Sequence, residues 1–218
     1  MNNEWSQLNK AMQLQLKKRE TYNIGIVNLL TLRKSLMEQI VKFKNTLSVD
    51  DFSAMPFMNA NGYHNKTVAY SLYHIFRIED IVANTLIAKA QQVFFYGSYQ
   101  SRMNSLIITT GNELVKQEIA EFSANLNIDE LYNYISDVDK STTYLLKTLS
   151  FSDMKTKMTK QDSDNIRSLK VVSESENAVW LIEYWCNKNI QGLLQMPFSR
   201  HWIMHVEAAL RIVNKLTA

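Results

Sequence analysis

The chain has 218 residues, of which 46% are hydrophobic and 21% are charged. This composition is typical of a globular protein, and the length suits one large core better than two, so we expect a single domain over residues 1–218. The formal net charge is +3, and no run of lysine and arginine or glycine-rich loop accompanies it. We therefore expect no nucleic-acid partner.

The cysteine count and the hydropathy pattern indicate the cellular compartment in which we expect the protein. A single cysteine, Cys186, excludes an internal disulfide and any zinc site built from several cysteines. The first twenty residues contain no apolar signal core, and no apolar span is long enough to cross a bilayer. We expect a cytoplasmic protein without a membrane partner. Cys186 itself reads as a buried structural thiol, because no histidine lies near it in the sequence to activate it.

The first half of the chain has helical periodicity with one clear break. A short helix is predicted over residues 5–18, and a long one over 21–47 has an apolar stripe that Arg33 interrupts. Residues 48–66 contain proline, glycine and several Asn and Asp residues, which indicate a loop. A second long helix is predicted over 67–90.

Helical patterns continue through the second half. We predict a short helix over residues 112–122 and a third long helix over about 129–149. A polar connection with fragments of helix follows over 152–177, and a last long helix is predicted over 199–216. The segment 178–188 is helical by length, although its aromatic residues also suit a strand. Four long amphipathic helices with short flanking helices predict an all-α fold, a four-helix bundle, and the lack of alternating strands argues against α/β folds.

Three of the four histidines lie on predicted core faces. His201 and His205 are four residues apart in the last helix, and His74 is on the inward face of the second. Bundles build metal sites by projecting ligands inward from facing helices, and a three-histidine site leaves one position of a tetrahedral zinc ion open. We predict a divalent-metal site at these residues. Three separately satisfied core histidines are the alternative, because spacing alone does not show that the two helices touch.

Other polar residues near His74 have less specific interpretations. Glu79 and Asp80 are read first as solvated helix charges and second as acceptors that orient a metal ligand. Arg77 is a weak candidate for contact with an anionic substrate. His64 is read as an exposed loop histidine, with a proton carrier at the site as the alternative.

Three stretches resemble the DinB-like (DNA-damage-inducible) superfamily. TVAYSLYHIFRIEDIVANTLI (67–87) is similar to the second helix of that family, and IDELYNYISDVDKSTTYLLKTLSFSDM (128–154) is similar to the third helix and the turn after it. RHWIMHVEAALRI (200–212) resembles the last helix with its pair of histidines. Together with the segments between them, these stretches extend over about two-thirds of the chain.

The resemblance implies a bundle with up-down-down-up connections and a divalent metal, often zinc or nickel, held by His74, His201 and His205. Some members of the family use the metal to activate a low-molecular-weight thiol, such as bacillithiol or mycothiol, for transfer or isomerisation. The resemblance thus implies a bacterial thiol S-transferase or isomerase with a small-molecule substrate. The alternative is a non-catalytic bundle that binds a partner, with or without metal, and a homodimer is compatible with either.

The chain departs from the family pattern in two places. Val206, Glu207 and Ala208 stand where family members often have Arg-Gly-Gln. The chain is also longer near its N-terminus and between residues 152 and 197, and inserted segments of this kind can reshape the mouth of the site.

Overall fold

The structure, a computed structural model, describes residues 2–62 and 64–218. Within these ranges the chain forms helices and connecting loops, with no β-strand and with one isolated bridge between Lys157 and Asn189. The predicted all-α fold class is therefore confirmed. The same residues contain no helix with both the length and the apolar character of a membrane span.

Helical elements follow one another through the chain, and two of them, η2 and η4, are π-helical while η1 and η3 are 3₁₀-helical. In chain order the elements are α1 (Asn3–Gln15), η1 (Arg19–Thr21), α2 (Tyr22–Thr46), α3 (Val49–Ser53), α4 (Val68–Asp80), η2 (Ile81–Ile87), α5 (Val93–Tyr96), α6 (Tyr99–Arg102), α7 (Gln117–Asn125), α8 (Ile128–Thr148), η3 (Phe151–Lys155), α9 (Lys160–Ser168), α10 (Trp180–Cys186), α11 (Ile190–Leu194), η4 (Met196–Arg200) and α12 (His201–Leu216).

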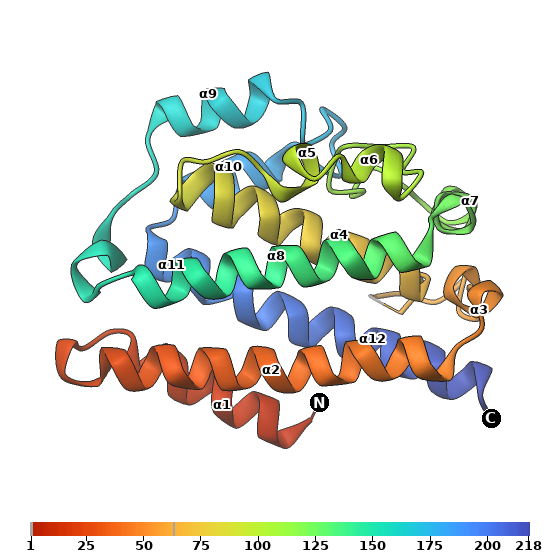
Figure 1. Cartoon of the computed structure of the whole chain (residues 1–218), viewed down its shortest axis with the longest axis horizontal. Helices are drawn as coiled ribbons and strands as arrows, with labels where there is room; N and C mark the ends of the chain where they lie inside the picture. Colours follow the sequence, from red (N-terminus) through yellow and green to blue (C-terminus); the bar gives the residue numbers. More distant parts are fainter. Residues whose placement is uncertain (1, 63) are drawn as a thin grey trace.

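The helix α4 is the centre of the molecule. It contacts α8 and α12, and α2 contacts both of those helices in turn, so the four long helices adjoin one another (Figure 1). The helix α1 packs along α2, and the short helices α5, α6 and α9 lie on the opposite side of the molecule. Every residue of α4 is buried, which is the pattern of a helix enclosed on all sides. Its polar side chains must therefore find partners inside the protein.

The buried apolar side chains form two clusters, one on either side of the middle of α4. Ile75 belongs to the first cluster, with residues of α8 and α12, and Ile78 belongs to the second, with residues of α10 and α11. His74 therefore lies near the boundary between the two clusters.

Three predicted helices have different limits in the structure. The helix predicted over 67–90 changes to π-helical geometry after Asp80, and the last one is preceded by the π-helical η4. The prediction over 112–122 is wrong in its first half, because α7 begins only at Gln117. There the Thr110 hydroxyl donates to the Asn112 side chain (2.7 Å), and local bonds of this kind compete with helix formation. The segment 178–188, which had two interpretations, is helical in α10.

Candidate metal centre

Three imidazole rings converge where α4 meets the start of α12. His74 comes from the middle of α4, and His201 and His205 come from the first two turns of α12. The ring centroids lie 5.0 Å apart for His74 and His201, 4.8 Å for His74 and His205, and 4.5 Å for His201 and His205. All three side chains are buried. The structure thus brings together the three residues that the sequence predicted as metal ligands.

The separations between the ring nitrogens fit a single cation. One nitrogen from each ring lies within 4.8 Å of the others, and Nε2 of His74 is 3.1 Å from Nε2 of His201. Two nitrogens bound to one zinc ion at tetrahedral angles lie about 3.3 Å apart. The distance of 3.1 Å also suits a hydrogen bond between two neutral rings. The triad is therefore compatible with a metal, and its geometry does not select which metal.

The ring of His74 is oriented by a backbone carbonyl. Its Nδ1 lies 2.8 Å from the carbonyl oxygen of Thr110, and because a carbonyl can only accept, Nδ1 carries the proton. The lone pair is then on Nε2, which faces His201. The ring also stacks on Tyr70, with centroids 5.6 Å apart and an interplanar angle of 10°. Histidine ligands of metals usually have such a second partner, which fixes their tautomer.

One ring nitrogen of His201 is buried without a hydrogen-bond partner among the described residues. Within the part of the chain that the structure describes, Nδ1 of its buried ring has no hydrogen-bond partner. Such atoms are uncommon in folded proteins, and an ion or a water molecule often explains them. A cation bound to the Nε2 atoms would not bond to this outer nitrogen, so the fit between the triad and a cation rests on the chemistry and spacing of the three rings.

Burial keeps the three rings neutral. It lowers the pKa of His74 from 6.5 to about 4 and lowers the pKa of His201 and of His205 well below 6.5. Proximity to the other rings of the triad lowers the last two further. Neutral imidazole is the form of histidine that binds metals, so no proton has to be removed at neutral pH.

Side chains of α4 hold a loop against this helix and thereby place further residues at the site. Five consecutive backbone carbonyls, 107–111, accept hydrogen bonds from one face of α4. Tyr73 Oη donates to Ile107 and Thr109 (3.1 Å each), Arg77 Nη2 to Ile108 (2.6 Å), His74 Nδ1 to Thr110 and Tyr70 Oη to Gly111 (2.9 Å). The next residue, Asn112, reaches the histidine site. In the sequence, only the threonine, glycine and asparagine residues of this segment indicate a loop.

The triad lines a cavity of about 260 Å³. Its other walls come mainly from α10 and η4, which belong to the later part of the chain, and from the loop after α6. These wall residues are Ile78, Asn112, Trp180, Leu181, Tyr184, Trp185, Met196 and Pro197. The sequence WLIEYW contains the aromatic part of this wall.

Glu79 is neither solvated nor in hydrogen-bonding contact with the histidines, so both interpretations of it were wrong. Its carboxylate is fully buried and pairs with both terminal nitrogens of Arg33, each at 2.7 Å. It also accepts a hydrogen bond of 2.7 Å from the indole of Trp202, and Arg33 donates to Asp139. One buried ionic cluster thus joins α2, α4, α8 and α12.

Asp80 and Arg77 are also buried, and each has a structural role. Asp80 accepts hydrogen bonds from the backbone N–H groups of Val93 and Phe94, each at 2.9 Å, and from Tyr134 Oη. The guanidinium of Arg77 lies 4.1 Å from the centroid of Phe94 and does not line the cavity. The solvated interpretation of Asp80 and the predicted contact of Arg77 with a substrate are therefore both wrong.

The remaining candidates lie away from the triad. His64 packs against Phe57, with ring centroids 5.4 Å apart, and lines a separate hollow with Glu207 and Arg211. Cys186 is half-buried, and burial raises the pKa of its thiol, which agrees with the predicted structural role.

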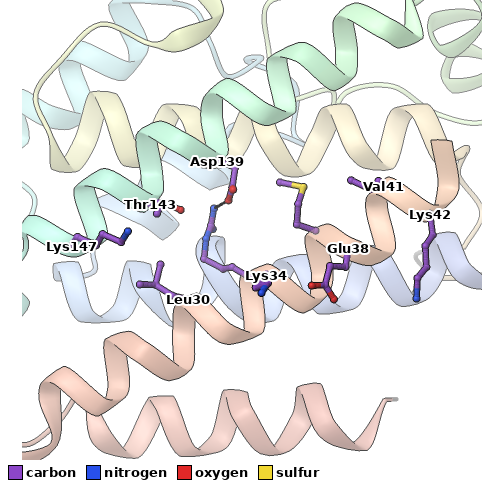
Figure 2. A pocket seen from close by; sticks show the side chains of 10 residues that line it. Leu30, Lys34, Glu38, Val41, Lys42, Asp139, Thr143 and Lys147 are labelled. Atoms are coloured by element: carbon purple, nitrogen blue, oxygen red, sulfur yellow. Dashed lines mark hydrogen bonds and ion pairs between the residues drawn. The ribbon is translucent and has the colours of Figure 1, made fainter. Parts of the chain in front are cut away.

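A larger groove of about 590 Å³ lies between α2 and α8 (Figure 2). Its walls carry Lys34, Lys42 and Lys147 together with Glu38 and the Arg33–Asp139 ion pair. None of the described residues that line it is a histidine or a cysteine. The chemistry of the ligand set, rather than the volume, identifies the triad cavity as the candidate site.

Comparisons with known proteins inform the fold alone. No family model matches the chain, and no curated protein matches it. Among solved structures, a conserved protein from Enterococcus faecalis has a similar fold with a TM-score of 0.57. The two sequences are 12% identical, over 84% of this chain and 92% of the other. At this identity the likeness carries no information on activity, and membership of the DinB-like superfamily stays a prediction.

Proposed function

We propose that this chain is a DinB-like metalloprotein in which His74, His201 and His205 hold one divalent cation, zinc or nickel, and that it acts as a metal-dependent thiol S-transferase or isomerase. One observation carries the proposal: three buried neutral imidazoles converge at the wall of a cavity large enough for a small molecule. The all-helical fold and the two-helix origin of the ligands support the up-down-down-up bundle that the resemblance implies.

The residues of the chain have distinct roles in this proposal. When bound, a divalent cation on three imidazoles supplies a Lewis acid that lowers the pKa of a thiol or of water. The carbonyl of Thr110 fixes the tautomer of His74. The side chains of α10 and η4 shield the site from bulk water, and Asn112 offers an amide to a ligand in the cavity.

A second candidate function is a non-catalytic metal-binding bundle. No carboxylate is among the described residues that line the cavity, and both nearby carboxylates, Glu79 and Asp80, are engaged elsewhere. A general base other than the ligands is therefore missing from the cavity wall.

Metal analysis followed by a thiol screen separates the two functions. The protein is purified without a histidine tag, reconstituted with zinc or nickel, and analysed for bound metal. We expect one ion per chain. Both functions fail if the wild-type chain retains no stoichiometric metal. The loaded protein is then assayed for transfer of cysteine, bacillithiol, mycothiol and simple aryl or alkyl thiols to an electrophile. Turnover supports the transferase, and a flat result across all these thiols favours the non-catalytic function.

A further inference from the structure

The walls of the triad cavity limit the chemistry of its ligand. Apart from the histidines, the described lining residues include no Asp, Glu, Lys or Arg, and Asn112 and Tyr184 are the polar ones among them. Aromatic and aliphatic side chains make up the rest. Where the donor atom of the ligand occupies the open position of the metal, a carboxylate or ammonium group elsewhere in such a cavity would lose its hydration without gaining a counter-charge from the wall, which is strongly unfavourable.

Two lysines outside the cavity lie over aromatic rings that line it or stack on its histidines. Lys66 Nζ lies 5.4 Å from the centroid of Tyr70, and Lys188 Nζ lies 4.2 Å from the centroid of Tyr184. Neither lysine lines the cavity. The described residues of the cavity wall therefore offer an anionic ligand no lysine or arginine side chain.

The aromatic wall also has the shape of a ring-binding surface. Trp180 and Tyr184, one turn apart in α10, pack edge to face with centroids 5.7 Å apart. Trp180 lines the cavity while 49% of its surface remains exposed. A ligand that covers this indole would remove apolar surface from water.

The volume sets the size of the ligand. A cavity of about 260 Å³ lies just below the range of about 300–1,000 Å³ for drug-sized ligands. It holds the equivalent of about nine water molecules at the density of the liquid. A ligand of about ten non-hydrogen atoms fits this space, whereas a bulky multiply charged thiol would have to leave most of its mass outside.

We infer that the substrate group received by this cavity is small, uncharged and largely apolar, with an aromatic or aliphatic body against α10 and one donor atom directed at the triad. This inference rests on the proposed function for the identity of the donor, a thiol. The body of the inferred ligand differs from the thiols that the family resemblance implies. Those thiols are polar, and bacillithiol is anionic.

Binding of two matched ligands tests the inference on the full chain. Calorimetry with zinc-loaded protein compares 4-methylbenzyl mercaptan with 4-(mercaptomethyl)benzoate, which differ mainly in the carboxylate. We expect the uncharged thiol to bind at least tenfold more tightly. Trp180→Ala is expected to weaken its binding about fivefold, and Tyr144→Ala, at an aromatic residue of α8 that is 73% exposed, is expected to leave it unchanged. Equal or tighter binding of the carboxylate overturns the inference.

A second experiment distinguishes failure of this inference from failure of the proposed function. If the chain retains no metal, the proposed function fails, and the two corresponding benzyl alcohols are titrated into metal-free protein while tryptophan fluorescence is recorded. A preference for the uncharged alcohol that Trp180→Ala reduces supports the apolar cavity by itself. Binding of neither alcohol, or a preference for the carboxylate, contradicts it. With metal bound, failure of both thiols to bind also contradicts it.

Discussion

At the scale of single residues, the site depends on histidines that differ in their second partners. His74 is oriented by the Thr110 carbonyl, whereas the outer nitrogen of His201 is buried without a partner among the described residues. The first ring is thus fixed by the fold, whereas the outer nitrogen of the second would be satisfied by a water molecule.

Replacing one ligand should abolish tight metal binding. For His201→Ala we expect zinc affinity to fall by more than about 100-fold, beyond the 10–100-fold effect typical of outer-shell partners. His64→Ala is the matched control, because this histidine lies in a separate hollow, and its affinity should equal that of the wild type. Competition with a chromogenic chelator measures both. Similar affinities for the two variants would show that the triad does not hold the metal.

The buried carboxylate of Glu79 should contribute to the free energy of unfolding. Glu79→Gln leaves Arg33 buried with one fewer anionic partner, so we expect a loss of about 3 kcal/mol in the free energy of unfolding. Glu38→Gln changes an exposed carboxylate of α2 and should stay within about 0.5 kcal/mol. Urea unfolding measures both, and a loss under 1 kcal/mol for Glu79→Gln would mean that the ion pair is not stabilising relative to a neutral amide.

At the scale of elements, the periodicity of apolar residues was enough to predict the long helices and the inward face of each histidine. It was not enough for the loop 107–111, because its order comes from hydrogen bonds to side chains of α4 that are far away in the sequence. The same limit explains the errors at Glu79 and Arg77. A charged residue in a helix is usually solvated, and only the tertiary structure shows that α4 is enclosed on all sides and that Arg33 meets Glu79.

The hydrogen bonds between α4 and this loop should control the order of the loop. Tyr70→Phe removes the donor to the Gly111 carbonyl, and we expect a loss of about 1–2 kcal/mol for the unsatisfied buried group. Amide hydrogen exchange of residues 107–112 should become faster, since the loop is held less firmly. The control Tyr144→Phe changes an exposed tyrosine and should alter neither quantity. Unchanged exchange in Tyr70→Phe would show that the loop is held by other contacts.

At the scale of the whole molecule, burial of three neutral histidines makes stability depend on pH. The pKa of His74 is about 4 in the folded chain and 6.5 as its ordinary value, so the unfolded chain binds the proton more strongly. Stability is therefore complete above about pH 6.5 and is lost as the pH falls towards 4. For metal-free protein we expect a loss of about 2 kcal/mol between pH 7 and pH 5 from His74 alone. Urea unfolding at the two pH values measures it, and equal stability would contradict the burial of neutral rings.

The shared metal is the central claim, and X-ray absorption at the zinc edge tests it most directly. Untagged protein reconstituted with one equivalent of zinc should show three imidazole nitrogens at about 2.0–2.1 Å, and His74→Ala should show two. A spectrum without imidazole neighbours, or one that His74→Ala leaves unchanged, would contradict the account.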